Sequence, residues 1–158
     1  PAGNNKGKTM KFRFHQTMVS KDFVNFLFKL FNKQKTFASS VNVVENCYLT
    51  FNLIKEIPLK FRAELTGGLF NAEEVHHLHM LKFPPGGTLD YHDHSKFERY
   101  SYVLYMDDVG GTSFQDNNDN LFFKSRKGKL IIFDSNIFHK AVTDNQTRYT
   151  AGGGIFKK

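Results

Sequence analysis

The chain has 158 residues, a length that fits one domain with a substantial core. Hydrophobic residues make up 40% of it, with 18 Phe, 6 Tyr and no Trp, so we expect a strand-rich fold with an aromatic interior. A single cysteine, Cys47, excludes an intramolecular disulfide framework and fits a reducing compartment, so we expect a soluble, cytoplasmic protein. The sequence has no apolar run of about 18 residues that could cross a membrane.

The net charge is +7, and a basic surface attracts nucleic acid or an acidic protein. The lysines are scattered along the chain and form no dense basic tract. Binding to nucleic acid is therefore possible on charge alone but is not the favoured interpretation.

The first part of the chain predicts a helical support over about residues 18–66. Residues 1–9 are polar and aperiodic, which is typical of a flexible arm or an expression leftover, and a short strand is expected at 11–15. Ser20 is placed to cap a helix whose apolar residues recur at helical spacing up to Phe31. A strand is expected at 41–44. A second helical pattern covers 49–65, with a kink at Pro58.

From residue 74 onward, short β-like runs alternate with turn residues. The oxygen-rich segment 115–120 is typical of a solvated hairpin connection. This pattern predicts a mainly β fold with N-terminal helices, a double-stranded β-helix (jelly roll, cupin-like barrel) with its core at about 74–156 in a single domain spanning 10–158. The seven expected strands are 75–83, 101–106, 111–114, 121–124, 129–134, 139–143 and 148–156.

Three histidines indicate a mononuclear metal site. His92 and His94 lie two residues apart, so in an extended segment they face the same way, with Asp93 facing the other. His139 follows an apolar strand and can complete a triangle of neutral imidazoles, a donor set that suits Fe, Zn, Cu or Ni. Arg148, nine residues later, could clamp a carboxylate by a bidentate pair.

From about Leu81 to Phe156 the chain resembles the Fe(II)/2-oxoglutarate-dependent dioxygenases, particularly their prolyl-4-hydroxylase-like branch. Phe83-Pro84-Pro85-Gly86 looks like the family's Tyr-x-x-Gly entry, and RYSYVLYMDDVGGTSF at 99–114 looks like its central strand pair. The segment 127–134 resembles the strand that leads to the distal histidine. The spacing between His139 and Arg148 is similar to the family's spacing between distal ligand and co-substrate clamp.

The resemblance implies a hydroxylase that uses Fe(II), O₂ and 2-oxoglutarate, with ascorbate as an assay additive. By position, His92 and His139 would be iron ligands. Arg148 would pair with the distal carboxylate of 2-oxoglutarate, and Tyr105 would help as a hydroxyl donor. The family analogy points to a prolyl residue in a peptide as substrate, while small-molecule substrates remain open.

Two positions depart from the family pattern. The family's second ligand is a carboxylate at the position where this chain has His94. Either His94 replaces it, giving a three-histidine site, or a β-bulge turns Asp93 inward, or the iron chemistry is altered or lost. Phe83 stands where the family has a tyrosine, and it cannot hydrogen-bond 2-oxoglutarate.

The same residues also fit a rival pattern. Gly86, His92, His94 and Glu98 resemble the first cupin motif, with His139 as a further ligand. A three-histidine site, alone or with Glu98, would then hold the metal, and Arg148 would have no evident role. We expect Glu98 to point at the metal in a cupin and at solvent in an oxygenase. A third hypothesis is a non-catalytic jelly-roll binding module.

Three further residues are candidates for the substrate site. His79 lies in a predicted strand and could line the pocket, although a histidine in such a place is commonly a core residue. Arg99 and Tyr102 could border the substrate mouth. The sequence does not define the oligomeric state.

Overall fold

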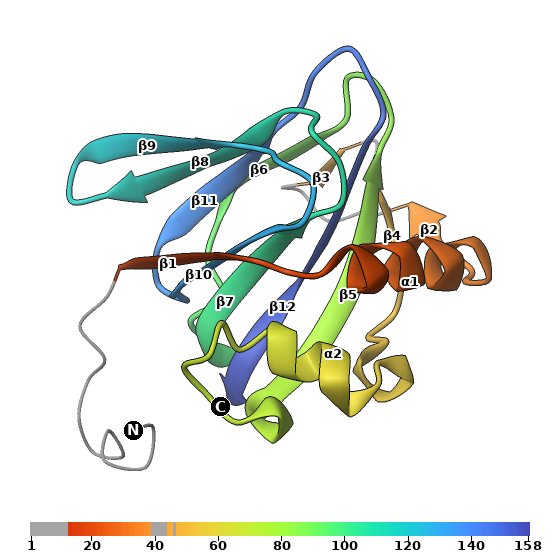
Figure 1. Ribbon diagram of the computed structural model, residues 1–158. Coiled ribbons are helices and arrows are strands. Elements are labelled where there is room, and N and C mark those ends of the chain that lie inside the picture. Colours follow the sequence, from red (N-terminus) through yellow and green to blue (C-terminus); the bar gives the residue numbers. More distant parts are fainter. Residues whose placement is uncertain (1–12, 39–43, 46) are drawn as a thin grey trace.

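The computed structural model describes residues 13–38, 44–45 and 47–158 (Figure 1). The predicted arm at 1–9 and most of the predicted strand at 41–44 lie outside these residues. Strands dominate the described part and pair antiparallel in two sheets. No helix within it is long and apolar enough to cross a membrane.

The larger sheet has the strand order β1-β10-β7-β12-β5-β4-β2, and the smaller sheet has the order β3-β6-β11-β8-β9. From β5 onward the chain passes between the two sheets at almost every connection, as expected for a jelly roll. The bounds are β1 (Phe14–Met18), β2 (Phe37–Ala38), β3 (Val44–Glu45), β4 (Tyr48–Leu49), β5 (Val75–Phe83), β6 (Thr88–His92), β7 (Glu98–Tyr105), β8 (Gly111–Asp116), β9 (Asp119–Lys124), β10 (Lys129–Asp134), β11 (Phe138–Val142) and β12 (Arg148–Lys157).

The seven strands predicted from residue 75 onward are all observed, with bounds that differ by up to three residues. The strand expected at 11–15 enters β1 only at Phe14, and β2, β4 and β6 were not predicted as strands. The hairpin connection between β8 and β9 is confirmed, since Asn117 and Asn118 both have positive φ (47° and 71°). Asparagine tolerates that conformation, which matches the twist of the two strands.

The helix α1 (Lys21–Asn32) begins where its cap was predicted. The Ser20 hydroxyl accepts a hydrogen bond from the Phe23 amide at 3.2 Å, which satisfies one of the free amides at the helix start. The Ser20 backbone and hydroxyl in turn both donate to the Glu64 carboxylate. The buried face of α1 consists of Phe23, Val24, Leu27 and Phe31.

The predicted second helical pattern at 49–65 is only partly correct. The 3-10 turn η2 (Ile54–Glu56) and the short helix α2 (Leu59–Glu64) follow β4, and η3 (Ala72–Glu74) precedes β5. Leu49 pairs with Leu81 of β5, so the start of the segment is a strand. The Asn52 side chain accepts from the amides of Ile54 and Leu78 and fixes a turn. These contacts with the sheet override the local periodicity.

The two faces of the larger sheet have different roles. One face packs against α1 and α2 in the main hydrophobic core, which includes Leu78, Leu104, Leu130 and Ile155. The other face looks toward the smaller sheet, where Phe114, Ile131 and Phe133 form a second cluster. The helices therefore cover the outer face of the larger sheet, and its inner face, toward the smaller sheet, is available for a site.

Three consecutive glycines, Gly152 to Gly154, lie in the middle of β12 between β5 and β7. A Cβ at Gly153 would collide with the carbonyl oxygen of His77 and lie 2.6 Å from the Tyr102 hydroxyl. Gly152 has more room, because its nearest neighbour would be the Tyr102 carbonyl oxygen at 3.4 Å. The absence of a side chain at Gly153 thus allows the hydrogen bond from the Tyr102 hydroxyl to the His77 carbonyl, at 2.8 Å.

We expect Gly153→Ala to destabilise the protein by about 1–3 kcal/mol, because overpacking forces β5 and β12 apart. Urea unfolding followed by circular dichroism measures this change. The matched control is Gly152→Ala in the same strand, for which we expect a much smaller loss. Equal losses for the two variants would show that close packing at Gly153 is not the cause.

Candidate metal centre and cavity

His92 and His139 lie directly opposite each other on neighbouring strands, because β6 pairs with β11 in that register. Their ring centroids are 4.2 Å apart. His92 Nδ1 is 2.7 Å from the Asp90 carbonyl oxygen, and His139 Nδ1 is 3.0 Å from the Ile137 carbonyl oxygen. Since each Nδ1 then carries the proton that it donates, both Nε2 atoms are left as lone-pair donors.

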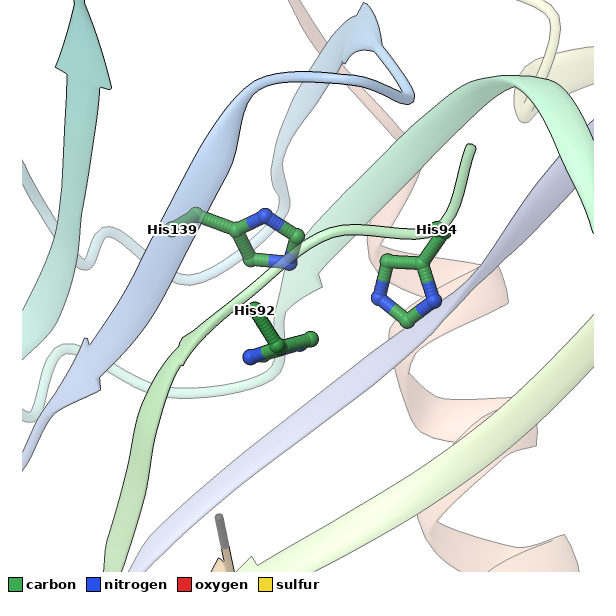
Figure 2. Close-up of side chains that lie close together, drawn as sticks. All are labelled: His92, His94 and His139. Atoms are coloured by element: carbon green, nitrogen blue, oxygen red, sulfur yellow. The ribbon is translucent and has the colours of Figure 1, made fainter. Parts of the chain in front are cut away.

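His94 completes the group from the segment that follows β6 (Figure 2). Its amide donates to the Ser135 carbonyl at 2.9 Å, which ties this segment to the end of β10. The His94 ring centroid is 4.9 Å from that of His92 and 5.2 Å from that of His139. One ligand atom from each ring lies within 4.8 Å of the others, so the three imidazoles can hold one metal ion.

Asp93 lies outside this group of three, although it stands between two of its members. Its carboxylate accepts a hydrogen bond from the Ser95 hydroxyl at 3.3 Å. The donor set that the fold brings together is therefore three neutral nitrogens, with no carboxylate among the grouped residues.

Burial keeps these imidazoles neutral. It lowers the pKa of His94 to about 4, and the neighbouring charge of His92 acts in the same direction. Burial also lowers the pKa of His92 and, further, that of His139, whose ring packs on Phe133 at a centroid distance of 4.8 Å. A metal ion needs the unprotonated form of the ring, so the environment prepares the group for binding.

The three rings face a cavity of about 730 Å³ between the sheets. Arg148, at the start of β12, lines the same cavity and is 1% exposed. Its Nε donates to the Val109 carbonyl at 3.1 Å, and its Cζ lies 5.2 Å from the centroid of the Phe83 ring. The Phe83 ring thus makes a cation–π contact with the guanidinium. The family that the sequence resembles has a tyrosine at this position.

Arg148 has no counter-ion within the part of the chain that is described, where the one ion pair joins Arg13 and Asp116. Burial lowers the pKa of Arg148, while Tyr105 and Asp107 act in the opposite direction. A guanidinium stays charged even so, and a buried charge without a partner is costly. An anionic ligand in the cavity would relieve that cost.

The structure gives Tyr105 a different position from the predicted one. Its side chain is fully buried, it is not among the residues that line the cavity, and its hydroxyl donates to Thr112 Oγ1 at 2.7 Å. Thr112 does line the cavity. The hydroxyl that lines the cavity therefore belongs to Thr112, which was not predicted from the sequence. The hydrogen bond from Tyr105 orients this hydroxyl.

Of the three predicted substrate residues, His79 and Tyr102 line the cavity. His79 Nδ1 is 2.9 Å from His77 Nε2, and burial lowers the pKa of His79 to about 3. Tyr102 is nearly buried and donates to the His77 carbonyl.

The structure does not bring Arg99 into the cavity lining. Its side chain is exposed, does not line the cavity and stacks on Tyr100, with Cζ 5.4 Å from the ring centroid. Strand alternation from Ser101 would have turned Arg99 inward. In the paired strand β12, Phe156 has a φ of 58°, while Tyr100 pairs with Ile155 and Glu98 pairs with Lys157 in one continuous register. Glu98 and Ser101 both line the cavity and Arg99 is exposed, so the strand alternation is broken at this end of β7.

Glu98 fits neither arrangement that was expected to separate a cupin from an oxygenase. It is buried and lines the cavity, but it is not part of the three-histidine group. Ser101 Oγ donates to its carboxylate at 3.1 Å. Burial raises the pKa of Glu98 to about 7.

Comparisons with known proteins show which solved structures have a similar fold. No family model and no curated protein sequence matches the chain. A prolyl-4-hydroxylase of Pseudomonas putida has a similar structure, with a TM-score of 0.68, 15% identity and 100% coverage of both chains. A prolyl hydroxylase of Trichoplax adhaerens, in complex with a hypoxia inducible factor peptide fragment, gives a TM-score of 0.72 and 12% identity over 97% of this chain and 86% of its own.

HygX of Streptomyces hygroscopicus, with nickel and 2-oxoglutarate bound, gives a TM-score of 0.64 and 10% identity over 89% of this chain and 82% of its own. The structural neighbours are thus prolyl hydroxylases and other 2-oxoglutarate-Fe(II) oxygenases. At this level of identity the likeness concerns the fold, and it confirms the predicted jelly-roll resemblance.

The lowered pKa values predict acid sensitivity of the metal-free protein. The unfolded chain binds protons on His79 and His94 near pH 6.5, whereas the folded chain does so near 3 and 4, so acidification between those values favours unfolding. His77, His92 and His139 act in the same direction. The raised pKa values of Glu98 and Asp107 act oppositely, but the histidines outnumber them.

With a chelator present, the urea midpoint should therefore fall from pH 7 to pH 5. The fall should be smaller in His79→Leu, which removes one of the titrating groups. A midpoint that does not change with pH would show that the histidines titrate normally in the folded protein.

Proposed function

We propose that this chain is an Fe(II)- and 2-oxoglutarate-dependent dioxygenase that hydroxylates its substrate. One observation carries the proposal: three neutral imidazoles and a buried, uncompensated Arg148 line the same cavity of a jelly roll. The imidazoles suit a divalent metal and the guanidinium suits a carboxylate. A dicarboxylate that reaches from the metal to Arg148 would satisfy both.

His92, His94 and His139 would hold the iron. The carbonyl partners of His92 and His139 fix those two rings with Nε2 toward the centre, so little reorganisation accompanies binding. When bound, Fe(II) would supply the activation of O₂ and the coupled oxidative decarboxylation of 2-oxoglutarate to succinate. The protein's share is to leave positions around the ion open for co-substrate and O₂.

Arg148 would bind the distal carboxylate of 2-oxoglutarate. The Val109 carbonyl and the Phe83 ring hold the guanidinium in place, so its remaining N–H groups can serve the ligand. Thr112, oriented by Tyr105, would offer a hydroxyl in the same cavity. The nickel and 2-oxoglutarate bound by the similarly folded HygX support a cavity of this kind.

For the prime substrate we propose a peptide, with a prolyl residue as the reacting unit. The support is the likeness to two prolyl hydroxylases, one of them in complex with a peptide fragment. A small-molecule substrate is the alternative within the same chemistry.

A second candidate function is a three-histidine metalloprotein of cupin type that does not use 2-oxoglutarate. The observation in its favour is the lack of a carboxylate among the grouped ligands. It leaves the buried Arg148 without a role, and Glu98 is not part of the ligand group, which is why we rank it second.

His139→Ala should abolish metal binding, because it removes one of three donors from the group. The measurement is metal content after reconstitution with Fe(II) under anaerobic conditions, together with the absorption spectrum of the Co(II) form. His15→Ala is the control, since His15 is on β1 and does not line the cavity. Metal retained by His139→Ala would contradict this ligand set, and a wild-type protein that takes up no metal would support a binding module.

Arg148→Met should raise the 2-oxoglutarate concentration needed for half-maximal succinate release by roughly tenfold to a hundredfold, because a charge-assisted clamp is worth roughly 1.5–3 kcal/mol. Arg126→Met, at an exposed arginine outside the cavity, is the matched control. If Arg148→Met folds normally and its 2-oxoglutarate requirement is unchanged, the proposed clamp is wrong.

A further inference from the structure

Glu98, the first residue of β7, is a buried carboxylate that the proposed chemistry does not use. Its side chain is 5% exposed and lies directly over the backbone of Gly154, where a Cβ would collide with both carboxylate oxygens. The glycine at position 154 therefore provides the space that Glu98 fills. The carboxylate is part of the cavity wall.

The Glu98 carboxylate has few partners. Its one hydrogen bond among the described side chains comes from Ser101, and no cation lies within ion-pair distance of it in that part of the chain. Lys157 is its cross-strand neighbour in the register of β7 and β12, but that side chain is exposed. Because a buried carboxylate without a partner is costly, such a group in a cavity is a candidate for ligand binding.

Glu98 and Arg148 lie at opposite ends of the cavity floor. Arg148, Thr150, Gly152 and Gly154 alternate along β12 and share one face, so Arg148 and Gly154 are about 20 Å apart along the strand. His79 pairs with Gly152 between these ends and lines the cavity together with His92 and His94. A co-substrate bound to Arg148 and the metal would leave the Glu98 end free.

We propose that Glu98 anchors the prime substrate by binding a cationic nitrogen, an ammonium or a guanidinium, at the end of the cavity opposite Arg148. The proposal rests on the proposed function for the placement of the co-substrate. The cationic group belongs to a basic side chain of a peptide or to a free amine, which share this chemistry. The reacting carbon then lies between that group and the metal.

Four lysines on the cavity rim, Lys55, Lys96, Lys157 and Lys158, oppose the approach of a cation. All four are exposed, so water and salt screen their charges, whereas the buried Glu98 is screened far less. Lys158 is also held by the Ser95 carbonyl at 2.8 Å. Lys157 is the cation of this chain that could itself pair with Glu98. The experiment therefore has to distinguish pairing with Lys157 from binding of an external cation.

The test measures the binding of three probe peptides to the purified protein by calorimetry: acetyl-Gly-Pro-Lys-Gly-amide and its Gln and Glu counterparts. The free amine agmatine is a fourth probe. The wild-type protein should bind the Lys peptide or agmatine roughly tenfold more tightly than the Gln peptide, the range of a charged hydrogen bond. Tighter binding of agmatine would identify a free amine, and tighter binding of the Lys peptide a basic residue.

Glu98→Gln, which keeps the shape and the partner Ser101, should remove that preference. Glu73→Gln, which deletes an exposed carboxylate outside the cavity, should retain it. A preference that survives in Glu98→Gln, or a wild-type preference for the Glu peptide, would overturn the proposal. So would a cation preference that emerges only in Lys157→Met, since Lys157 would then be the partner of Glu98.

The binding assay runs with and without Fe(II) and 2-oxoglutarate, so the two proposals fail separately. If the wild-type protein releases no succinate and takes up no metal but prefers the cationic probes, the oxygenase proposal falls and Glu98 remains a cation site. If succinate is released but the preference is absent, the function stands and the anchor is wrong.

Discussion

The site depends on one register, the pairing of β6 with β11 that sets His92 opposite His139. A shift of one residue in that pairing would turn one of the two rings to the other face of the smaller sheet. The position of the third histidine also depends on this pairing. The chain continues from His92 to His94, and the His94 amide is tied to Ser135 just before β11.

Much of the site could be predicted from the sequence, because it depends on residue spacings and on hydrogen bonds between residues close together in the chain. The spacing of His92 and His94 and the position of His139 after an apolar strand identified the three rings that the fold brings together. Arg148 was identified through family spacing. The Ser20 cap was identifiable because it is a local hydrogen bond within one turn.

Other features depend on contacts between distant segments and were not predictable. The helical periodicity at 49–65 gave way to the pairing of Leu49 with β5. The inward position of Glu98 breaks the alternation of β7, and its side chain lies over Gly154 of β12, more than 50 residues along the chain. The partner of the Tyr105 hydroxyl, Thr112, belongs to the other sheet.

The glycines of β12 have a consequence for how the cavity can change its depth. The Glu98 carboxylate lies over Gly154, and the His79 ring lies near Gly152, where no side chain of β12 stands in the way. Rotating either side chain about its own bonds would deepen the hollow locally while every strand stays in register. Such a rotation would break the hydrogen bond between Ser101 and Glu98 or the one between His77 and His79, while the hydrogen bonds of the sheet would stay intact.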